Sequence, residues 1–273
     1  MAPDVPFDFS DAKSVALYDE LPMWSALAGA RLLEHVPLDV TRVLDLGTGT
    51  GFPGLELAER LGPGACVLGV DPWGEGLARA RAKAVRWPVP GFHAVRGDGI
   101  ALPLRAASVD LVVSNLGVNN FADPDAAFAE VRRVLPLGGR LVLSTNLAGH
   151  FRELYGAFDR VLAARGADAA RARLAAHVAH RATVPGLSAV LARHGLAVTA
   201  AHVDDAAWRF RDGAAVLAHH FVRLGFVDGW REVAGEPHAA VLDALRAELD
   251  RTARAAGGLT LTIPLAVIVA RAA

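Results

Sequence analysis

The chain has 273 residues, and its 28 basic side chains nearly balance its 29 acidic ones, which leaves a formal net charge of −1. This balance argues against a nucleic-acid partner, because a polynucleotide is bound through an excess of positive charge. A hydrophobic content of 53% excludes an intrinsically disordered chain and predicts a sizeable core.

The cysteine content and the longest late apolar run bear on the location of the protein. Cys66 is the single cysteine, so the chain can form neither an internal disulfide nor a cysteine-based metal cluster. The apolar run at 259–270 is shorter than the ~20 residues of a membrane helix and contains Pro264. We therefore predict a cytoplasmic protein without a membrane span, and the sequence leaves its oligomeric state open.

The first part of the chain predicts two helices followed by strands that alternate with helices. Such short apolar strands, separated by helices, indicate an α/β protein whose parallel sheet is covered on both faces. The helices are expected at 11–18, 23–35, 54–61, 76–85 and 125–134, and the strands at 42–46, 67–70, 92–96, 109–114 and 140–144.

The regular alternation lapses in the later part of the chain. Helices are expected there at 150–165, 167–181, 187–194, 212–224 and 238–254, and strands at 196–202 and 259–269. We divide the chain accordingly into an N-terminal helical lid, a Rossmann-like core, a helical cap that contains one further core strand, and a C-terminal core strand. These four parts are assigned to residues 1–40, 41–148, 149–257 and 258–273.

A glycine loop follows the first predicted strand, in the segment from Val43 to Gly54. Glycines at such a turn let backbone atoms approach a ligand closely. The spacing of Gly49, Gly51 and Gly54 also satisfies the dinucleotide fingerprint, in which a helix N-terminus receives a pyrophosphate. An NAD(P)-dependent oxidoreductase therefore remains an alternative.

Three acidic residues stand at the ends of three successive predicted strands. Asp45 lies directly before the glycine loop, and we expect its carboxylate to repel a pyrophosphate and attract an ammonium or sulfonium group. Asp71 ends the second strand, where a carboxylate can accept hydrogen bonds from both ribose hydroxyls of a nucleoside. Asp98 follows the third strand and is placed to accept a hydrogen bond from an adenine amino group, with Ile100 or Leu102 against the ring. The pattern predicts a site for a cationic nucleoside.

With these motifs the sequence resembles the class I S-adenosylmethionine-dependent methyltransferases, in particular the ubiquinone/menaquinone-biosynthesis-type small-molecule branch. The resemblance covers about residues 14–146. It implies a seven-stranded, mostly parallel Rossmann-like sheet that ends in an antiparallel hairpin, with helices on both faces. The motifs that carry it are the segments 43–51, 69–71, 97–99 with 102–104, 108–115 and 130–141.

The resemblance also implies S-adenosylmethionine as the cofactor and assigns residues to it. Asp45 and the glycine loop would receive the methionine end, Asp71 the ribose and Asp98 the adenine. The full set of predicted cofactor-binding residues is Tyr18, Asp45, Gly47, Thr48, Gly49, Gly51, Asp71, Pro72, Asp98, Gly99, Ile100, Asn115 and Leu116.

The acceptor side of the predicted site is less defined. The loop at 114–121 lacks the Asn/Asp-Pro-Pro-aromatic motif of family members that methylate exocyclic amines of bases. Asn119 is a candidate for orienting an acceptor, and His150 is a candidate general base because histidine titrates near neutral pH. His177 and His180 would share a helix face, but no further ligands are evident beside them, so we predict no metal site.

The sequence therefore predicts an enzyme, a methyltransferase that passes the methyl group of S-adenosylmethionine to a small-molecule acceptor by in-line displacement. The identity of the acceptor atom stays open. The alternatives are the oxidoreductase, a methyltransferase acting on RNA, which the segment 51–54 resembles, and a non-catalytic nucleoside-binding module.

Overall fold

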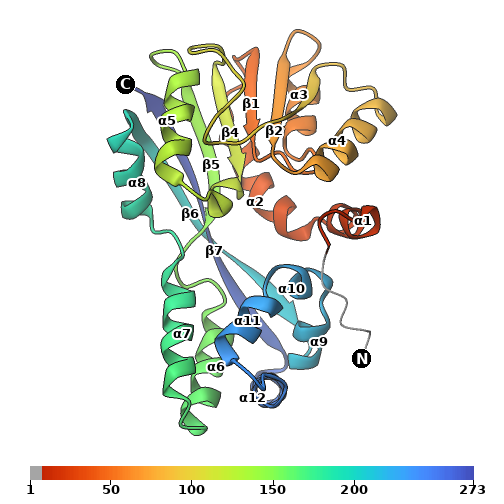
Figure 1. Cartoon of the computed structure of the whole chain (residues 1–273), viewed down its shortest axis with the longest axis vertical. Helices are drawn as coiled ribbons and strands as arrows, with labels where there is room; N and C mark the ends of the chain where they lie inside the picture. The colour runs from red at the N-terminus through yellow and green to blue at the C-terminus, as the bar shows by residue number, and fades with distance from the viewer. Residues whose placement is uncertain (1–7) are drawn as a thin grey trace. The chain divides into compact units, whose positions relative to one another are not determined.

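The computed structural model describes residues 8–273, which form a seven-stranded sheet and the helices around it (Figure 1). The strands are β1 (Arg42–Leu46), β2 (Cys66–Asp71), β3 (Phe92–Arg96), β4 (Leu111–Asn115), β5 (Arg140–Asn146), β6 (Leu196–Phe210) and β7 (Leu259–Ala272). They lie in the order β3-β2-β1-β4-β5-β7-β6, and β1 to β5 are parallel to one another. The chain reverses its direction of strand addition at β1, where such folds bind their ligands.

The helices before β6 agree closely with the predicted ones. They are α1 (Ala12–Glu20), α2 (Met23–Leu33), α3 (Gly54–Leu61), α4 (Gly74–Arg86), the short 3-10 helix η1 (Gly117–Asn120), α5 (Pro124–Val134), α6 (Arg152–Ala164), α7 (Asp168–Ala179) and α8 (Val184–Arg193). Asp11, Asp123 and Thr183 accept a backbone N–H at the start of α1, α5 and α8 respectively. These side chains satisfy N–H groups that have no partner within the helix.

The core explains why the parallel strands are apolar throughout. Val43 and Leu44 are adjacent on β1 and therefore point to opposite faces of the sheet, yet neither is exposed. On one face, Val43 belongs to a cluster that includes Leu32 of α2 and Leu57 of α3. Burial on both faces removes the alternation of apolar and polar residues that marks a half-exposed strand.

The two last strands form the antiparallel end of the sheet. The backbone N–H of Ala273 donates to Gly195, and the Thr199 hydroxyl donates to the carbonyl of Val269, so β6 and β7 run in opposite directions. The predicted seven-stranded, mostly parallel sheet with an antiparallel hairpin is thus confirmed. Both strands are longer than expected. Most side chains at 200–207 are exposed, and this stretch lacks the alternating pattern from which a strand is predicted.

The remaining helices depart from the expected pattern. They are α9 (Gly213–Ala218), α10 (His220–Gly225), α11 (Val227–Ala234) and α12 (Ala239–Ala256). The single helix expected at 212–224 is wrong, because His219 has an extended backbone, with φ −63° and ψ 128°, and separates α9 from α10. Helix α11 was not expected, and it is held by the buried side chains of Trp230 and Val233.

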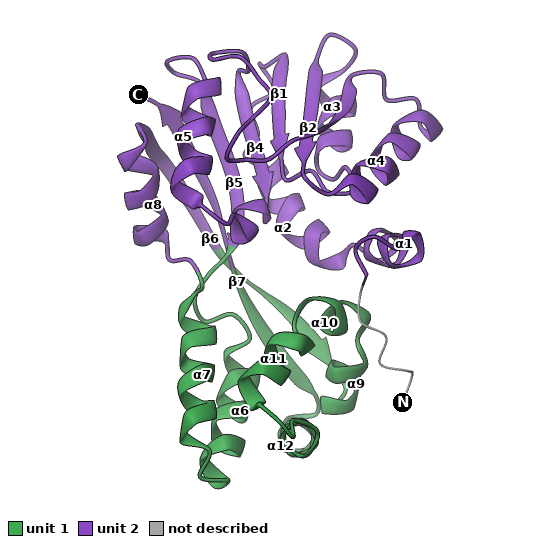
Figure 2. Cartoon of the chain, viewed as in Figure 1, with its two compact units in different colours: residues 1–6, 146–181, 204–264 green, residues 7–145, 182–203, 265–273 purple. Residues whose placement is uncertain are grey.

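The chain divides into two compact units (Figure 2). The sheet unit contains the described residues 8–145 with 182–203 and 265–273, and it includes α1 to α5 and all of β1 to β4. The helical unit contains residues 146–181 and 204–264, with α6, α7 and α9 to α12. The first seven residues of the predicted N-terminal lid lie outside the described part of the chain. Within residues 8–273, no helix combines the length and apolar character needed to cross a membrane.

Candidate functional site

The glycine loop of the sheet unit connects β1 to α3. Gly47, Gly49 and Gly51 have φ values of 77°, 51° and 102°, a region that side-chain-bearing residues rarely adopt. The start of the loop is bonded to the end of β2, since the N–H groups of Gly47 and Thr48 both donate to the carbonyl of Val70. A Cβ on Gly49 would meet only one atom, Trp73 Cζ3 at 4.0 Å. The backbone at Gly49 is therefore open to a ligand.

Asp45 holds this loop from inside. Its side chain is completely buried, and its Oδ2 accepts hydrogen bonds from Thr48 Oγ1 at 2.6 Å and from Gly54 N at 2.9 Å. Burial raises the pKa of this carboxyl to about 7, against the opposing effect of the two hydrogen bonds. The sequence predicts Asp45 beside the methionine end of a cofactor. In the structure, Asp45 Oδ2 is bonded to the glycine loop, the segment predicted to receive that end.

Asp71 presents its carboxylate at the end of β2. Its Oδ2 accepts a hydrogen bond from Gly49 N at 2.8 Å, and its Oδ1 accepts one from Trp73 N at 2.8 Å. Burial raises its pKa, and the two N–H donors oppose this rise. A carboxylate has about four acceptor positions, so each oxygen retains a lone pair for a further donor. Pro72 is exposed and stands between Asp71 and Trp73 in the chain.

An aromatic group lies beside Asp71. The indole of Trp73 packs edge-on against Tyr18, with ring centroids 5.6 Å apart, and its Nε1 donates to the carbonyl of Phe9 at 2.7 Å. Burial and the Asp71 carboxylate raise the pKa of the Tyr18 hydroxyl. The sequence analysis named Tyr18 but missed Trp73, although its position directly after Asp71-Pro72 is the signal that could have found it.

Helix α1 is attached to α4 by ion pairs. Asp19 contacts Arg79 Nε at 2.8 Å and Lys83 Nζ at 2.5 Å, and its side chain is only 9% exposed. Hydrogen bonds from these groups and from Thr50 lower the pKa of Asp19 in spite of its burial. The pairs fix the helix that carries Tyr18.

The third predicted acid has a more open environment. Asp98 is exposed, and its Oδ1 accepts a hydrogen bond from Ile100 N at 3.2 Å. Ile100 is 43% exposed, whereas Leu102 is buried. Gly99 is buried, and a Cβ there would lie 3.5 Å from Leu46 and 3.7 Å from the Phe121 ring. An exposed carboxylate beside an exposed aliphatic side chain fits the edge and face of an adenine.

The end of β4 is fixed by Asn115. Its Nδ2 donates to the carbonyl of Ser25 in α2 at 2.9 Å, and its Oδ1 accepts from Ser144 Oγ at 2.7 Å. Leu116 follows with φ 60°, in the left-handed region, and is buried. Asn119 is exposed, and its Oδ1 accepts a hydrogen bond from Thr145 Oγ1. The amide of Asn115 therefore has a positioning role toward α2, which the sequence did not reveal.

Helix α2 approaches this strand end closely because of Gly29. A Cβ at Gly29 would lie 2.2 Å from the Phe52 ring and 3.0 Å from Asn115 Nδ2, so a larger residue would push the helix away. Gly29 thus allows α2 to pack against Phe52 and Asn115, and this role was not predicted from the sequence. A single glycine inside an apolar helical pattern gives no signal of what it packs against.

His150 belongs to the helical unit rather than to the sheet unit. It is 1% exposed, and its ring stacks on Phe151 with centroids 3.8 Å apart. Burial lowers its pKa to about 2, with further lowering by Arg181, His177 and His180. A group with so low a pKa is neutral at pH 7 and a weak proton acceptor, so the geometry gives little support to His150 as a general base.

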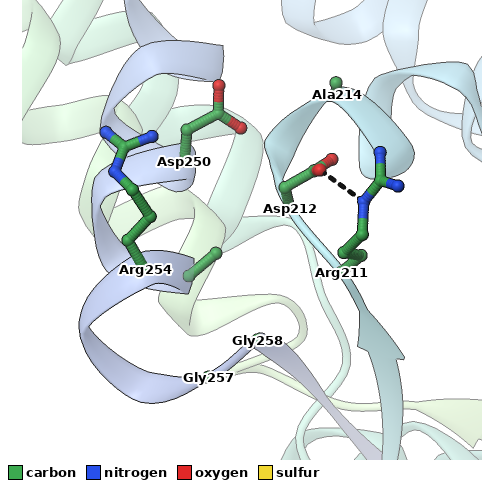
Figure 3. Close-up of a pocket in the computed structure, with 8 residues that line it drawn as sticks. Arg211, Asp212, Ala214, Asp250, Arg254, Gly257 and Gly258 are labelled. Carbon is green, nitrogen blue, oxygen red and sulfur yellow. Dashed lines mark hydrogen bonds and ion pairs between the residues drawn. The ribbon is translucent and has the colours of Figure 1, made fainter.

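A separate pocket of about 370 Å³ lies in the helical unit and shares no residue with the predicted sites (Figure 3). Arg211 and Arg254 line it together with Asp212 and Asp250. Arg211 donates to Asp212 at 2.8 Å, and Asp250 accepts from Gly213 N, so the acids offset the charge of the arginines. This pocket carries no functional assignment.

The site residues of the sheet unit define a class of protein. An open glycine loop, a carboxylate at the end of β2 and a further carboxylate after β3 meet at the carboxyl edge of a parallel sheet beside its switch point. This is the layout of a Rossmann-like domain that binds a nucleoside.

Comparison with known proteins identifies the domain more closely. The methyltransferase domain family matches residues 44–143. A demethylmenaquinone methyltransferase from Deinococcus radiodurans is 40% identical over 152 residues, which are 53% of this chain and 59% of that protein. A malonyl-[acyl-carrier protein] O-methyltransferase from Gallionella capsiferriformans is 38% identical over 134 residues, which are 47% of this chain and 46% of that protein.

Solved structures share the fold. The YcgJ protein from Bacillus subtilis has a TM-score of 0.58 and 19% sequence identity, and the match covers 89% of this chain and 97% of that one. Residues 44–143 are thus a methyltransferase domain, and the predicted relation to class I S-adenosylmethionine-dependent methyltransferases of the menaquinone-biosynthesis type is confirmed. The chain spans about half the length of the curated relatives it matches.

Proposed function

We propose that the chain is an S-adenosylmethionine-dependent methyltransferase that acts on a small molecule. The observation that carries this proposal is the carboxylate of Asp71, which is held by the N–H groups of Gly49 and Trp73 at the end of β2. Its remaining lone pairs suit the two ribose hydroxyls of a nucleoside. Demethylmenaquinone and malonyl-[acyl-carrier protein] methyltransferases among the relatives support a metabolite or carrier-bound acceptor.

The residues of the site fit this cofactor. When bound, S-adenosylmethionine supplies a methyl group on a positively charged sulfur, which is already a good leaving group. The chain has to bind and align: Asp71 would orient the ribose, Asp98 the adenine edge, and the open backbone of Gly49 the methionine end. Alignment of two reactants contributes roughly 7–11 kcal/mol to such a reaction.

The oxidoreductase alternative requires a free helix N-terminus for a pyrophosphate. At the start of α3 the N–H of Gly54 already donates to Asp45 at 2.9 Å, and the preceding residue, Pro53, has no N–H. A buried carboxyl group therefore occupies the position that a dinucleotide phosphate needs. This argues against NAD(P).

The RNA-methyltransferase alternative has little electrostatic support. The net charge of −1 provides no excess of positive charge for a polynucleotide, and the motif for base amines is missing at 114–121. The proposal also includes a cytoplasmic location for the enzyme and a small molecule, rather than RNA, as its methyl acceptor.

Calorimetry separates the proposal from its rivals. We expect the full chain to bind S-adenosylmethionine and S-adenosylhomocysteine but not NAD. Asp71→Asn should weaken this binding by about 1–3 kcal/mol, or about 5- to 150-fold, because a charged hydrogen-bond acceptor is lost. Asp110→Asn is the matched control, since Asp110 is paired with Arg42 at 2.6 Å at the other end of the sheet strands.

Two outcomes would overturn the proposal. One is tight NAD binding without any response to the sulfonium compound or its demethylated product. The other is cofactor binding without product in a turnover screen of phenol, amine, thiol and activated-carbon acceptors, which would leave a non-catalytic binding module. Unchanged affinity in Asp71→Asn contradicts the ribose assignment alone.

A further inference from the structure

The loop after β3, at residues 97–104, closes on itself. The N–H of Ala101 donates to the carbonyl of Asp98 at 3.1 Å, which makes a tight turn. A Cβ on Gly97 would lie 2.9 Å from Pro103 Cδ, so the proline ring lies directly against the residue that precedes Asp98. The position of Asp98 therefore depends on where Pro103 lies.

Two charged side chains of α5 hold the residues on both sides of Pro103. Glu130 Oε2 accepts a hydrogen bond from the N–H of Leu102 at 2.7 Å. Arg133 donates through Nη1 to the carbonyl of Leu104 at 2.7 Å and through Nη2 to the carbonyl of Leu102 at 3.2 Å. Three main-chain groups beside Pro103 are thus bonded to α5.

Glu130 and Arg133 also fix each other. Arg133 Nε donates to Glu130 Oε1 at 2.6 Å and Arg133 Nη2 donates to Glu130 Oε2 at 2.7 Å, the paired arrangement in which a guanidinium matches a carboxylate. The bonds from Arg133 and from the N–H of Leu102 lower the pKa of Glu130 against the effect of burial, so this carboxylate is charged at neutral pH. An ion pair three residues apart stabilises a helix only slightly. The bonds to the loop are therefore the distinctive feature of this pair.

The Asp98 side chain is held only by its own loop. Its carboxylate is exposed, and among residues 8–273 it accepts one hydrogen bond, from the N–H of Ile100 at 3.2 Å. The direction of the carboxylate thus follows the main chain of the loop. Since α5 holds that main chain through Glu130 and Arg133, the two side chains control where Asp98 points.

We propose that Glu130 and Arg133 are positioning residues for adenine recognition, because they hold Asp98 where its carboxylate accepts a hydrogen bond from the amino group of the base. They act through the loop at 97–104. All of these residues belong to the sheet unit. The inference rests on the proposed function, in which Asp98 receives the adenine edge of S-adenosylmethionine.

Calorimetry of the full chain with two nucleosides measures adenine recognition. S-adenosylhomocysteine carries an amino group at position 6 of its base, and S-inosylhomocysteine carries an oxygen there, which cannot donate to Asp98. We expect wild type to bind the first at least about tenfold more tightly, because the second loses a hydrogen bond to a charged group. The ratio of the two dissociation constants is called the adenine preference.

Two variants should lower the adenine preference at least about fivefold. In Glu130→Gln, one carboxylate oxygen becomes an amide N–H2 group that faces a donor of Arg133 or Leu102, so the pair no longer holds the loop. Arg133→Lys keeps the positive charge but replaces the planar fork by a single ammonium group. The amide of Leu102 should exchange with solvent faster in both variants than in wild type.

Asp125→Asn is the matched control on the same helix. Asp125 pairs with Arg193 at 2.8 Å, and this pair connects α5 to α8 rather than to the loop. We expect the control to have the adenine preference and the Leu102 amide exchange of wild type. An equal fall of the preference in Asp125→Asn and Glu130→Gln refutes the inference, because it reflects a general loosening of α5.

The same measurements separate this inference from the proposed function. If Glu130→Gln and Arg133→Lys weaken both nucleosides equally or neither of them, the adenine preference is unchanged; the function stands and the positioning role is refuted. If wild type binds both nucleosides with equal affinity, Asp98 does not recognise the amino group, and the positioning role is refuted as well. If wild type binds neither nucleoside, the methyltransferase proposal itself fails, and the inference fails with it.

Discussion

Asp45 should make the folded chain less stable as the pH rises, whereas most carboxyl groups make it more stable, and Asp45→Asn should remove this effect. Asp45 is completely buried, and its pKa of about 7 lies above its ordinary value of 3.8. The folded chain therefore binds this proton more tightly than the unfolded chain does. Its contribution to stability is complete below the unfolded pKa and is lost as the pH rises through the folded pKa.

The size of the effect follows from the two pKa values. A difference from 3.8 to about 7 corresponds to about 4 kcal/mol above neutral pH. About 2–3 kcal/mol of this should be lost between about pH 5 and pH 8. Asparagine has no charge to bury, so the variant lacks this loss. Its amide oxygen can accept the hydrogen bonds that Thr48 and Gly54 donate to Asp45 Oδ2.

Urea unfolding of wild type and Asp45→Asn at about pH 5 and pH 8 measures the difference. We expect the variant to lose less stability than wild type on going to the higher pH, by about 2–3 kcal/mol. Asp110→Asn is the control, because hydrogen bonds from Arg42 lower the pKa of Asp110 and it stays ionised throughout this range. If the effect of Asp45→Asn is the same at both pH values, the raised pKa of Asp45 is refuted.

Two further substitutions test the packing around the site. Gly54→Ala should destabilise the fold by about 1–3 kcal/mol, because its Cβ would lie 2.6 Å from Asp45 Oδ2 and 2.8 Å from the Phe92 ring. Urea unfolding should show little change for Gly64→Ala, where a Cβ meets nothing within 4 Å, and equal effects of the two would contradict this account. Asp19→Asn should cost about 1–3 kcal/mol and speed amide exchange in α1, since both ion pairs to α4 are weakened. Glu34→Gln is the control, because it affects only the exposed pair of Glu34 with Arg31 at 3.7 Å and should leave amide exchange in α1 unchanged. If exchange in α1 is as slow in Asp19→Asn as in wild type, the ion pairs do not hold α1.

The parallel part of the sheet could be predicted well because its signals are local. Apolar runs, the glycines at 47–54 and the cap residue Asp123 each identify an element from a few neighbouring residues. The hairpin and its surroundings were harder to predict. β6 is exposed along much of its length, and α11 depends on the burial of Trp230, which no local pattern shows.

The sequence by itself determined the class of protein, since three acids that follow three strands, with a glycine loop, need only chain order to be recognised. Only the tertiary structure decided what these groups do. It turned Asp45 toward Gly54 rather than into open space, brought Trp73 to Tyr18, and placed Tyr155 beside His177. It also buried His150 and so lowered the pKa of this candidate base, because burial depends on contacts between residues far apart in the chain.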